Sequence, residues 1–265
     1  GKDGSGSAGG FKNRKAILGL TSDFGTFTAG RQDNPFKVTI VDDTVADDFN
    51  GSNVLSTATQ RAMTSTLTAQ SPKFGNEYDA DFDRVGKVIA YTTPDFAGFS
   101  ANAAVMMDSD LYPTNNRKNA DLWTINAKYA YDLGADNGQI LAKLGYIQGK
   151  VAGSSETIEN LNGRYSSKMW GLYVGYLSDA FNVTASYADG NHKVENAGVA
   201  GTAPKQKSKG WDLGASYSFG PNYFSTVRAA YGQSELKQGD NKDKVKSWAV
   251  GFEQKLSTRT RAWVE

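Results

Sequence analysis

The residues that could act together on a solute are carboxylates and cations that lie near one another in the sequence. Arg31 precedes the acidic stretch and Arg84 follows it. Facing charges of opposite sign across a narrow aqueous gap create a field that orders water and sets ion preference. A charge run is otherwise most often a solvated loop, so both interpretations stay open here. The four carboxylates of the stretch are Asp42, Asp43, Asp47 and Asp48.

Catalytic and metal chemistry find little support in the composition. The 265 residues contain no cysteine and one histidine, His192, which the pattern places in a loop. Disulfides, thiolate metal sites and cysteine nucleophiles are therefore excluded, and a histidine cluster has no second ligand. A catalytic histidine would need a nucleophile and an orienting acid nearby. We expect no enzyme, no cofactor and no metal site.

The overall charge and residue types narrow the class further. Lys and Arg number 29 against 28 Asp and Glu, whereas a nucleic-acid-binding protein normally has a basic excess. We therefore expect no nucleic-acid partner. No apolar run approaches the about 20 residues of a transmembrane helix. The 13 Tyr, 13 Phe, 5 Trp and 29 Gly favour strands and turns, so the sequence predicts an all-β protein.

Apolar residues recur at every second position. From Trp211 to Phe219 the odd positions are apolar or alanine, and the even positions are small or polar. This period is typical of a strand with one apolar face. Aromatic residues lie near both ends of that face, as from Trp170 to Tyr176, in the manner of two interfacial girdles around a lipid band. The pattern predicts transmembrane strands.

Twelve strands are predicted, and their connections alternate between short and long. The long connections cover 32–83, 108–120, 151–165, 190–209 and 234–244. Short turns at one end and long polar loops at the other are typical of an outer-membrane antiparallel β-barrel. The strands are expected at 13–20, 26–31, 84–92, 98–107, 121–132, 139–150, 166–177, 181–189, 210–219, 223–233, 245–256 and 259–265.

Strand parity indicates an incomplete barrel. The chain opens in a connection of the long side and stops in a strand that returns to that side. Such barrels normally have an even number of strands and both termini on the short-turn side. We therefore expect an odd number of strands to be missing at each end.

Two segments resemble a known family. Asn13–Pro35 reads NRKAILGLTSDFGTFTAGRQDNP, and Val88–Ala101 reads VIAYTTPDFAGFSA. Both are similar to the trimeric general porins of Gram-negative bacteria, in which R-x-A-x-x-G-L is followed by a D-F-G turn and a strand ending G-R. A later hairpin of the family reads I-x-Y-x-x-P-x-F-x-G-F. The resemblance implies one porin domain over residues 1–265, holding strands four to fifteen of sixteen.

The same resemblance implies a site. The connection at about 32–83 would fold into the barrel and narrow it, bringing its four aspartates to the constriction opposite a basic wall. Arg31 matches the family's constriction arginine, although alternation alone puts it on the lipid side unless Gly30 hosts a β-bulge. If Ile89 and Tyr91 face lipid, alternation places Arg84 on the lumen face together with Ala90. A lumen position also avoids the cost of a lipid-facing charge, which is roughly 2–4 kcal/mol at the bilayer midplane. Weaker lumen candidates are Arg14, Lys128, Lys143 and Arg228.

These observations predict a passive diffusion channel for ions and small hydrophilic solutes in the bacterial outer membrane. The resemblance implies a homotrimer surrounded by outer-membrane lipid and lipopolysaccharide. One alternative is a substrate-specific channel for a sugar or an anion. A sugar channel would need an aromatic track along the lumen, where Tyr173 is the only clear aromatic. A soluble β-sandwich binding module is a weaker alternative, because the girdled apolar faces count against it.

Overall fold

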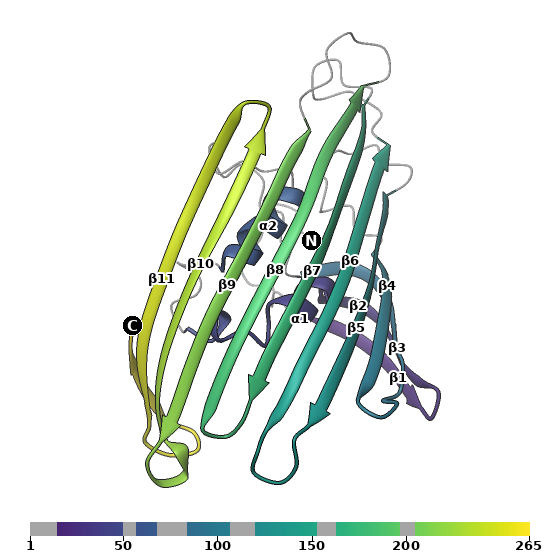
Figure 1. The fold of residues 1–265 in the computed structure, drawn as a ribbon. Helices are drawn as coiled ribbons and strands as arrows, with labels where there is room; N and C mark the ends of the chain where they lie inside the picture. The colour runs from purple at the N-terminus through teal and green to yellow at the C-terminus, as the bar shows by residue number, and fades with distance from the viewer. Residues whose placement is uncertain (1–14, 50–56, 68–83, 107–119, 153–162, 197–204) are drawn as a thin grey trace, which may run out of the picture.

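Twelve strands form one antiparallel sheet in which each strand pairs with the next along the chain (Figure 1). The computed structural model describes residues 15–49, 57–67, 84–106, 120–152, 163–196 and 205–265. The elements in chain order are β1 (Ala16–Ser22), β2 (Gly25–Asp33), α1 (Pro35–Ile40), η1 (Val45–Asp47), α2 (Ala58–Leu67), β3 (Arg84–Thr92), β4 (Phe99–Met106), β5 (Ala120–Asp132), β6 (Gln139–Ala152), β7 (Gly163–Leu177), β8 (Phe181–Asn196), β9 (Gln206–Phe219), η3 (Pro221–Tyr223), β10 (Ser225–Gln238), β11 (Asn241–Lys255) and β12 (Arg261–Val264).

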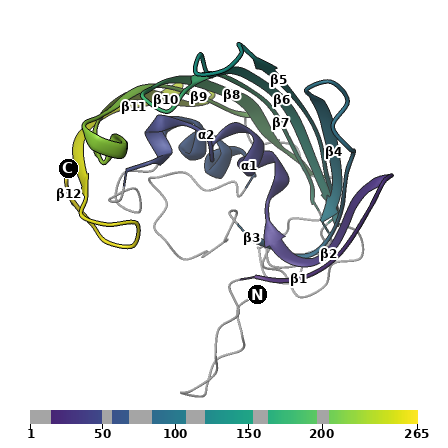
Figure 2. The same cartoon turned by 90° about the horizontal axis from the view of Figure 1, so that it is seen from below.

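The sheet is strongly curved, and both α-helices lie on its concave side (Figure 2). In the described residues β1 and β12 are its two edge strands. The predicted fold class, an antiparallel β-barrel with a segment folded inward, is confirmed. The alternative of a β-sandwich, which needs two packed sheets, does not fit, because the described strands form one sheet. We call residues 34–49 and 57–67, which carry both helices, the inward segment.

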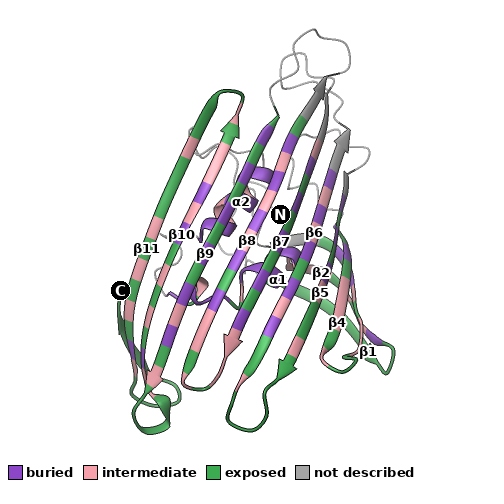
Figure 3. Ribbon diagram, in the orientation of Figure 1, coloured by how far each residue is buried: buried purple, intermediate pink, exposed green. Residues whose placement is uncertain are grey.

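The two faces of the sheet differ in polarity, as the two-residue period predicts. Along β9, exposed and buried residues alternate over most of the strand (Figure 3). Leu213 and Val250 are about half exposed on the outer face, whereas Asp212 and Ser216 are buried on the inner face. An apolar outer face and a polar inner face match a barrel that lies in lipid and encloses water.

Helices do not supply the membrane crossing in the described part of the chain. None of its helices is both long enough and apolar enough to span a bilayer.

Several strands extend further toward the long connections than predicted. The predicted loop 234–244 is wrong, because β10 and β11 continue through it and Gln238 pairs with Asn241 across a two-residue turn. The predicted loop 190–209 is also too long, since β8 runs to Asn196 and β9 begins at Gln206. His192 is therefore in a strand, not in a loop. These strand ends are polar on both faces, so backbone pairing persists where the apolar period has ended.

Candidate functional site

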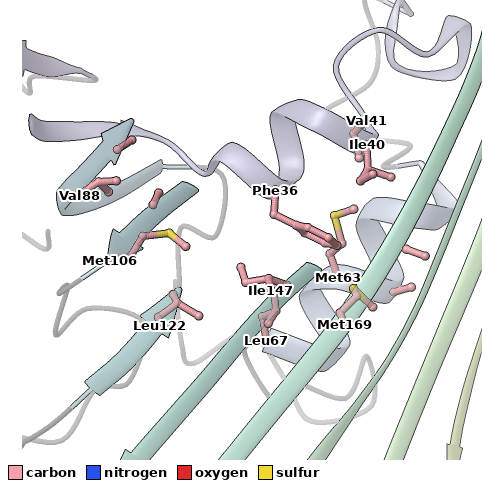
Figure 4. Close-up of a cluster of buried hydrophobic side chains, with 14 residues drawn as sticks. Phe36, Ile40, Val41, Met63, Leu67, Val88, Met106, Leu122, Ile147 and Met169 are labelled. Atoms are coloured by element: carbon pink, nitrogen blue, oxygen red, sulfur yellow. The ribbon is translucent and has the colours of Figure 1, made fainter. Parts of the chain in front are cut away.

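The inward segment packs on the inner wall through an apolar cluster. Asn34 begins α1, and its side-chain oxygen accepts a 3.1 Å hydrogen bond from the backbone N–H of Phe36. Pro35 fits the first helical position, where no backbone donor is needed. The ring of Phe36 then meets apolar side chains from helices and wall strands (Figure 4). The labelled members are Phe36, Ile40, Val41, Met63, Leu67, Val88, Met106, Leu122, Ile147 and Met169.

A glycine in the wall lets the segment approach the backbone closely. Gly171 in β7 faces Ile40, and a Cβ at this position would lie 2.7 Å from Cγ1 of Ile40. Any larger side chain would therefore displace α1. Each fully buried apolar side chain contributes about 1.5–3 kcal/mol, so this packing holds the segment against the wall.

Asp43 is the acidic residue of the stretch that meets the wall most directly. Its carboxylate forms an ion pair with Lys143 of β6. The ammonium group of Lys143 lies 4.7 Å from the ring centre of Tyr173, whose hydroxyl donates a 3.0 Å hydrogen bond to the backbone carbonyl of Asp43. The side chain of Lys143 is 5% exposed and that of Asp43 is 52% exposed. The negative member of this pair therefore faces the interior of the barrel.

A second charged group surrounds Asp48. Arg228 of β10 donates a 3.2 Å hydrogen bond to the backbone carbonyl of Asp48, and its guanidinium lies 3.8 Å from the carboxylate of Glu253. Arg261 approaches the same carboxylate at 2.9 Å. Burial raises the pKa of the Asp48 carboxyl above its usual value, and Arg228 partly offsets this rise. The carboxylate of Glu253 is buried and lies close to the guanidinium groups of both Arg228 and Arg261. This ion pair holds Arg228 beside Asp48, at the end of residues 34–49.

The other two aspartates of the stretch have local partners. The carboxylate of Asp42 lies 2.7 Å from the ammonium group of Lys37, which belongs to α1. The backbone N–H of Asp47 donates a 3.2 Å hydrogen bond to the hydroxyl of Thr44, which caps η1. All four predicted aspartates therefore lie in the inward segment, where Asp43 contacts Lys143 of the wall and Asp48 contacts Arg228.

The second helix is held at its first residues by Asp212. The carboxylate of Asp212 accepts 2.8 Å hydrogen bonds from the backbone N–H groups of Ala58 and Thr59 and from the Thr59 hydroxyl. A carboxylate at this end of a helix satisfies donors that have no partner within the helix. One turn later, Arg61 donates hydrogen bonds of 3.0 and 3.1 Å to the hydroxyls of Ser234 and Ser247.

Arg31 lies beside the predicted bulge. The pairing of β2 with β3 shifts register between Gly30 and Gln32, and Gly30 has a φ of 127°. The hydroxyl of Thr28 lies 2.9 Å from the side-chain oxygen of Gln32. Four residues of a straight strand span about 13 Å, so β2 bends sharply here. The bulge at Gly30 is confirmed, whereas the lumen position of Arg31 stays a prediction.

Of the remaining basic candidates for the pore lining, Arg84 and Lys128 lie at different places in the sheet. Arg84 begins β3 and pairs with Asp33, but a register shift separates it from Ala90, so alternation along β3 does not carry to its end. Its lumen position stays a prediction. Lys128 is exposed and shares its face of β5 with the inward-facing Asn126. Arg14 lies outside the described residues.

Two of the weaker lumen candidates contact the acidic stretch. Lys143 pairs with the carboxylate of Asp43, and Arg228 donates a hydrogen bond to the backbone carbonyl of Asp48. Glu253, Arg261 and Asp212 were missed as partners. Glu253 and Asp212 occupy inward positions of alternating strands, so their parity was a signal that could have found them.

The single histidine belongs to the wall. His192 is 5% exposed, and its Nδ1 lies 2.6 Å from the hydroxyl of Ser167. In the described ranges, no group of three or more His, Cys, Asp and Glu side chains is arranged to hold a metal ion.

A curved antiparallel sheet with an apolar outer face, a polar inner face and a charged inward segment defines a channel-forming outer-membrane β-barrel. The chain belongs to the Gram-negative porin family, whose sequence pattern matches residues 2–265. Members of this family are passive diffusion channels of the bacterial outer membrane. A search of curated protein sequences finds no match.

Solved structures agree with this family at the level of the fold. An anion-selective porin from Comamonas acidovorans is 20% identical with a TM-score of 0.60, and the match covers 94% of this chain and 65% of that one. OmpF of Salmonella typhi in complex with daunomycin is 17% identical with a TM-score of 0.60, covering 94% and 68%. A trimer form of OmpT from Vibrio cholerae is 13% identical with a TM-score of 0.61, covering 97% and 70%.

Proposed function

We propose that ions and small hydrophilic solutes cross the outer membrane through the water beside the inward segment, and that its charged groups set the preference between anions and cations. The carrying observation is the half-exposed carboxylate of Asp43, which faces the interior while its partner Lys143 is buried behind it. In a narrow aqueous gap, such a fixed charge acts on ions within about 10 Å at 0.1 M salt.

A sugar-specific channel is less well supported. Tyr173 is the aromatic residue that could have begun a lumen track, but it is fully buried. Its ring lies under Lys143 and its hydroxyl is bonded to the backbone of Asp43. An aromatic ring covered in this way offers no stacking surface to a sugar.

The basic side of the proposed constriction is Arg31 and Arg84, which lie at opposite ends of the connection that carries the inward segment. The Arg84→Glu substitution exchanges a positive for a negative charge. We expect the reversal potential in a salt gradient to move toward cation preference, and Arg31→Glu to act in the same direction. Neutralising Asp42 and Asp43 together should move it toward anion preference.

The measurement is the reversal potential of the folded channel in a planar lipid bilayer at low salt, with the exposed, outward-facing Lys246→Gln variant as control. All shifts should shrink toward 1 M salt, where the screening length falls to about 3 Å. An unchanged reversal potential for Arg84→Glu at low salt would remove Arg84 from the constriction.

A further inference from the structure

A dense group of lysines lies on the outer face of the barrel, at the end where the long connections leave the sheet. We call it the lysine patch. Its members come from the start of β9, the end of β10 and the start of β11, and strand register places them side by side. They are Lys207, Lys209, Lys237, Lys242, Lys244 and Lys246.

The patch is an unfavourable arrangement of charge without an anion. Lys237 pairs directly with Lys207 on one side and with Lys242 on the other, giving three lysines in one cross-strand row. Like charges directly opposite one another destabilise a sheet. The next row is Asp189, Lys209, Glu235 and Lys244, so two carboxylates lie among six ammonium groups and the patch keeps a clear positive excess.

Glu235 shows where an anion is attracted. Its carboxylate lies 3.0 Å from the ammonium group of Lys242 and 3.8 Å from those of Lys209 and Lys244. These side chains surround a hollow of about 360 Å³, which is also lined by Tyr187 and Trp211. The lysine side chains around it are about half exposed, so the charge of the patch is directed outward.

The position of the patch along the barrel identifies its surroundings. Immediately below the lysines, the outward-facing residues become aromatic: Trp211 lies against Tyr231 at 5.5 Å between ring centres, and Trp248 pairs with Tyr231. Such aromatic belts mark the boundary between hydrocarbon and headgroups. Long loops of outer-membrane barrels face the cell exterior. The lysine patch therefore lies at the depth of the headgroups of the outer leaflet.

We propose that the lysine patch binds the phosphate groups of a lipid in the outer leaflet, with the acyl chains lying along the aromatic belt below. Across the sheet, the three strands β9, β10 and β11 span about 10 Å. Along the strands, the patch from the row of Lys237 to the row of Lys246 spans about 14 Å. This area is large enough for a headgroup with more than one phosphate. Ammonium groups bind phosphate as point charges. The proposal rests on the proposed function only through the outer-membrane location, and it leaves ion passage unaffected.

The test uses the folded channel in detergent and lipid A with two phosphates as the probe, with binding measured by native mass spectrometry. The Lys209→Gln/Lys244→Gln variant should bind lipid A about 25-fold more weakly, at about fivefold for each lysine. The matched control is Lys255→Gln/Arg259→Gln, which removes two cations at the short-turn end. It should stay within about twofold of the unchanged protein. The single Lys207→Gln variant, with an expected loss of about fivefold, replaces the double variant if that variant does not fold.

Two further probes identify the source of the phosphate. Dephosphorylated lipid A should bind much more weakly, and inorganic phosphate should not displace lipid A at comparable concentrations. Equal binding of the double variant and the unchanged protein, equal binding of the dephosphorylated lipid, or displacement by inorganic phosphate would each overturn the proposal. Channel conductance is measured on the same samples, so a failure of lipid binding is separated from a failure of the channel.

Discussion

At the residue scale, the contact between Asp43 and Lys143 determines how much charge the inward segment presents to water. Lys143 is buried and Asp43 is half exposed, so the cation reduces the negative charge that a passing ion meets. The ring of Tyr173 holds the ammonium group in place from the other side. On the proposed function, ion preference would therefore depend on a residue that has almost no contact with the solution.

The first prediction follows from this pair. The Lys143→Gln substitution leaves the Asp43 carboxylate without its counter-charge, so the reversal potential at 0.1 M salt should move toward cation preference. The Asp43→Asn/Lys143→Gln double variant should restore much of the original value. A shift of the same size in both variants would mean that Asp43 does not contribute.

The second prediction concerns pH and Asp48. Burial raises the pKa of this carboxyl, so Asp48 takes up its proton at a higher pH than an ordinary aspartate, whose pKa is about 3.9. As pH falls, the negative charge of Asp48 is lost at a higher pH than that of an ordinary aspartate, and the channel should lose cation preference. Titration of the reversal potential from about pH 7 to about pH 4 should show a smaller change in Asp48→Asn. Identical titration curves would contradict the assignment.

Part of this site could be predicted from the residues and part could not. The acidic stretch was recognised because four aspartates lie within seven positions. Which wall cation meets which aspartate depends on how the segment folds back across β6 and β10, and no local pattern encodes that path. The contacts of Lys143 and Arg228 with the acidic stretch were therefore not predictable, although the inward parity of both residues was visible.

At the element scale, the close packing of α1 against β7 requires that residue 171 has no side chain. In Gly171→Val, the new side chain would collide with Ile40 and displace α1, at an overpacking cost of about 1–3 kcal/mol. We expect altered and more variable conductance from a barrel that still folds, measured on single channels.

Gly19→Ala is the matched control. A Cβ at Gly19 meets its nearest atoms at 3.7 Å, which is ordinary contact. Its conductance should equal that of the unchanged channel. Normal conductance in Gly171→Val would show that α1 does not depend on this close approach.

The strands themselves were largely predictable, and their ends were not. An exposed outer face alternates with a buried inner face along the strands, most regularly in β9, and all twelve strands were predicted. Above the aromatic belt, both faces are polar and the period disappears. Strands β8 to β11 continue there because backbone pairing does not require apolar side chains, which explains the wrong loops at 190–209 and 234–244.

At the scale of the whole molecule, we expect three barrels to associate. The motive is the resemblance of Asn13–Pro35 and Val88–Ala101 to segments of the trimeric porins. Leu18 and Leu20 of β1 are 80% and 70% exposed, which provides an apolar surface for lipid or for a neighbouring barrel. Native mass spectrometry in mild detergent should give the mass of three chains, and a single-barrel mass would argue against association.

The most direct test of the account is the single-channel conductance of a variant in which residues 42–48 are deleted. These residues follow α1 and include η1, whereas the strands on either side carry the backbone pairing. The barrel should fold, conduct more than the unchanged channel and admit larger solutes. A deletion of residues 134–137, in the turn between β5 and β6, is the control and should leave the pore width unchanged. If the 42–48 deletion leaves conductance unaltered in a folded barrel, the inward segment does not narrow the channel.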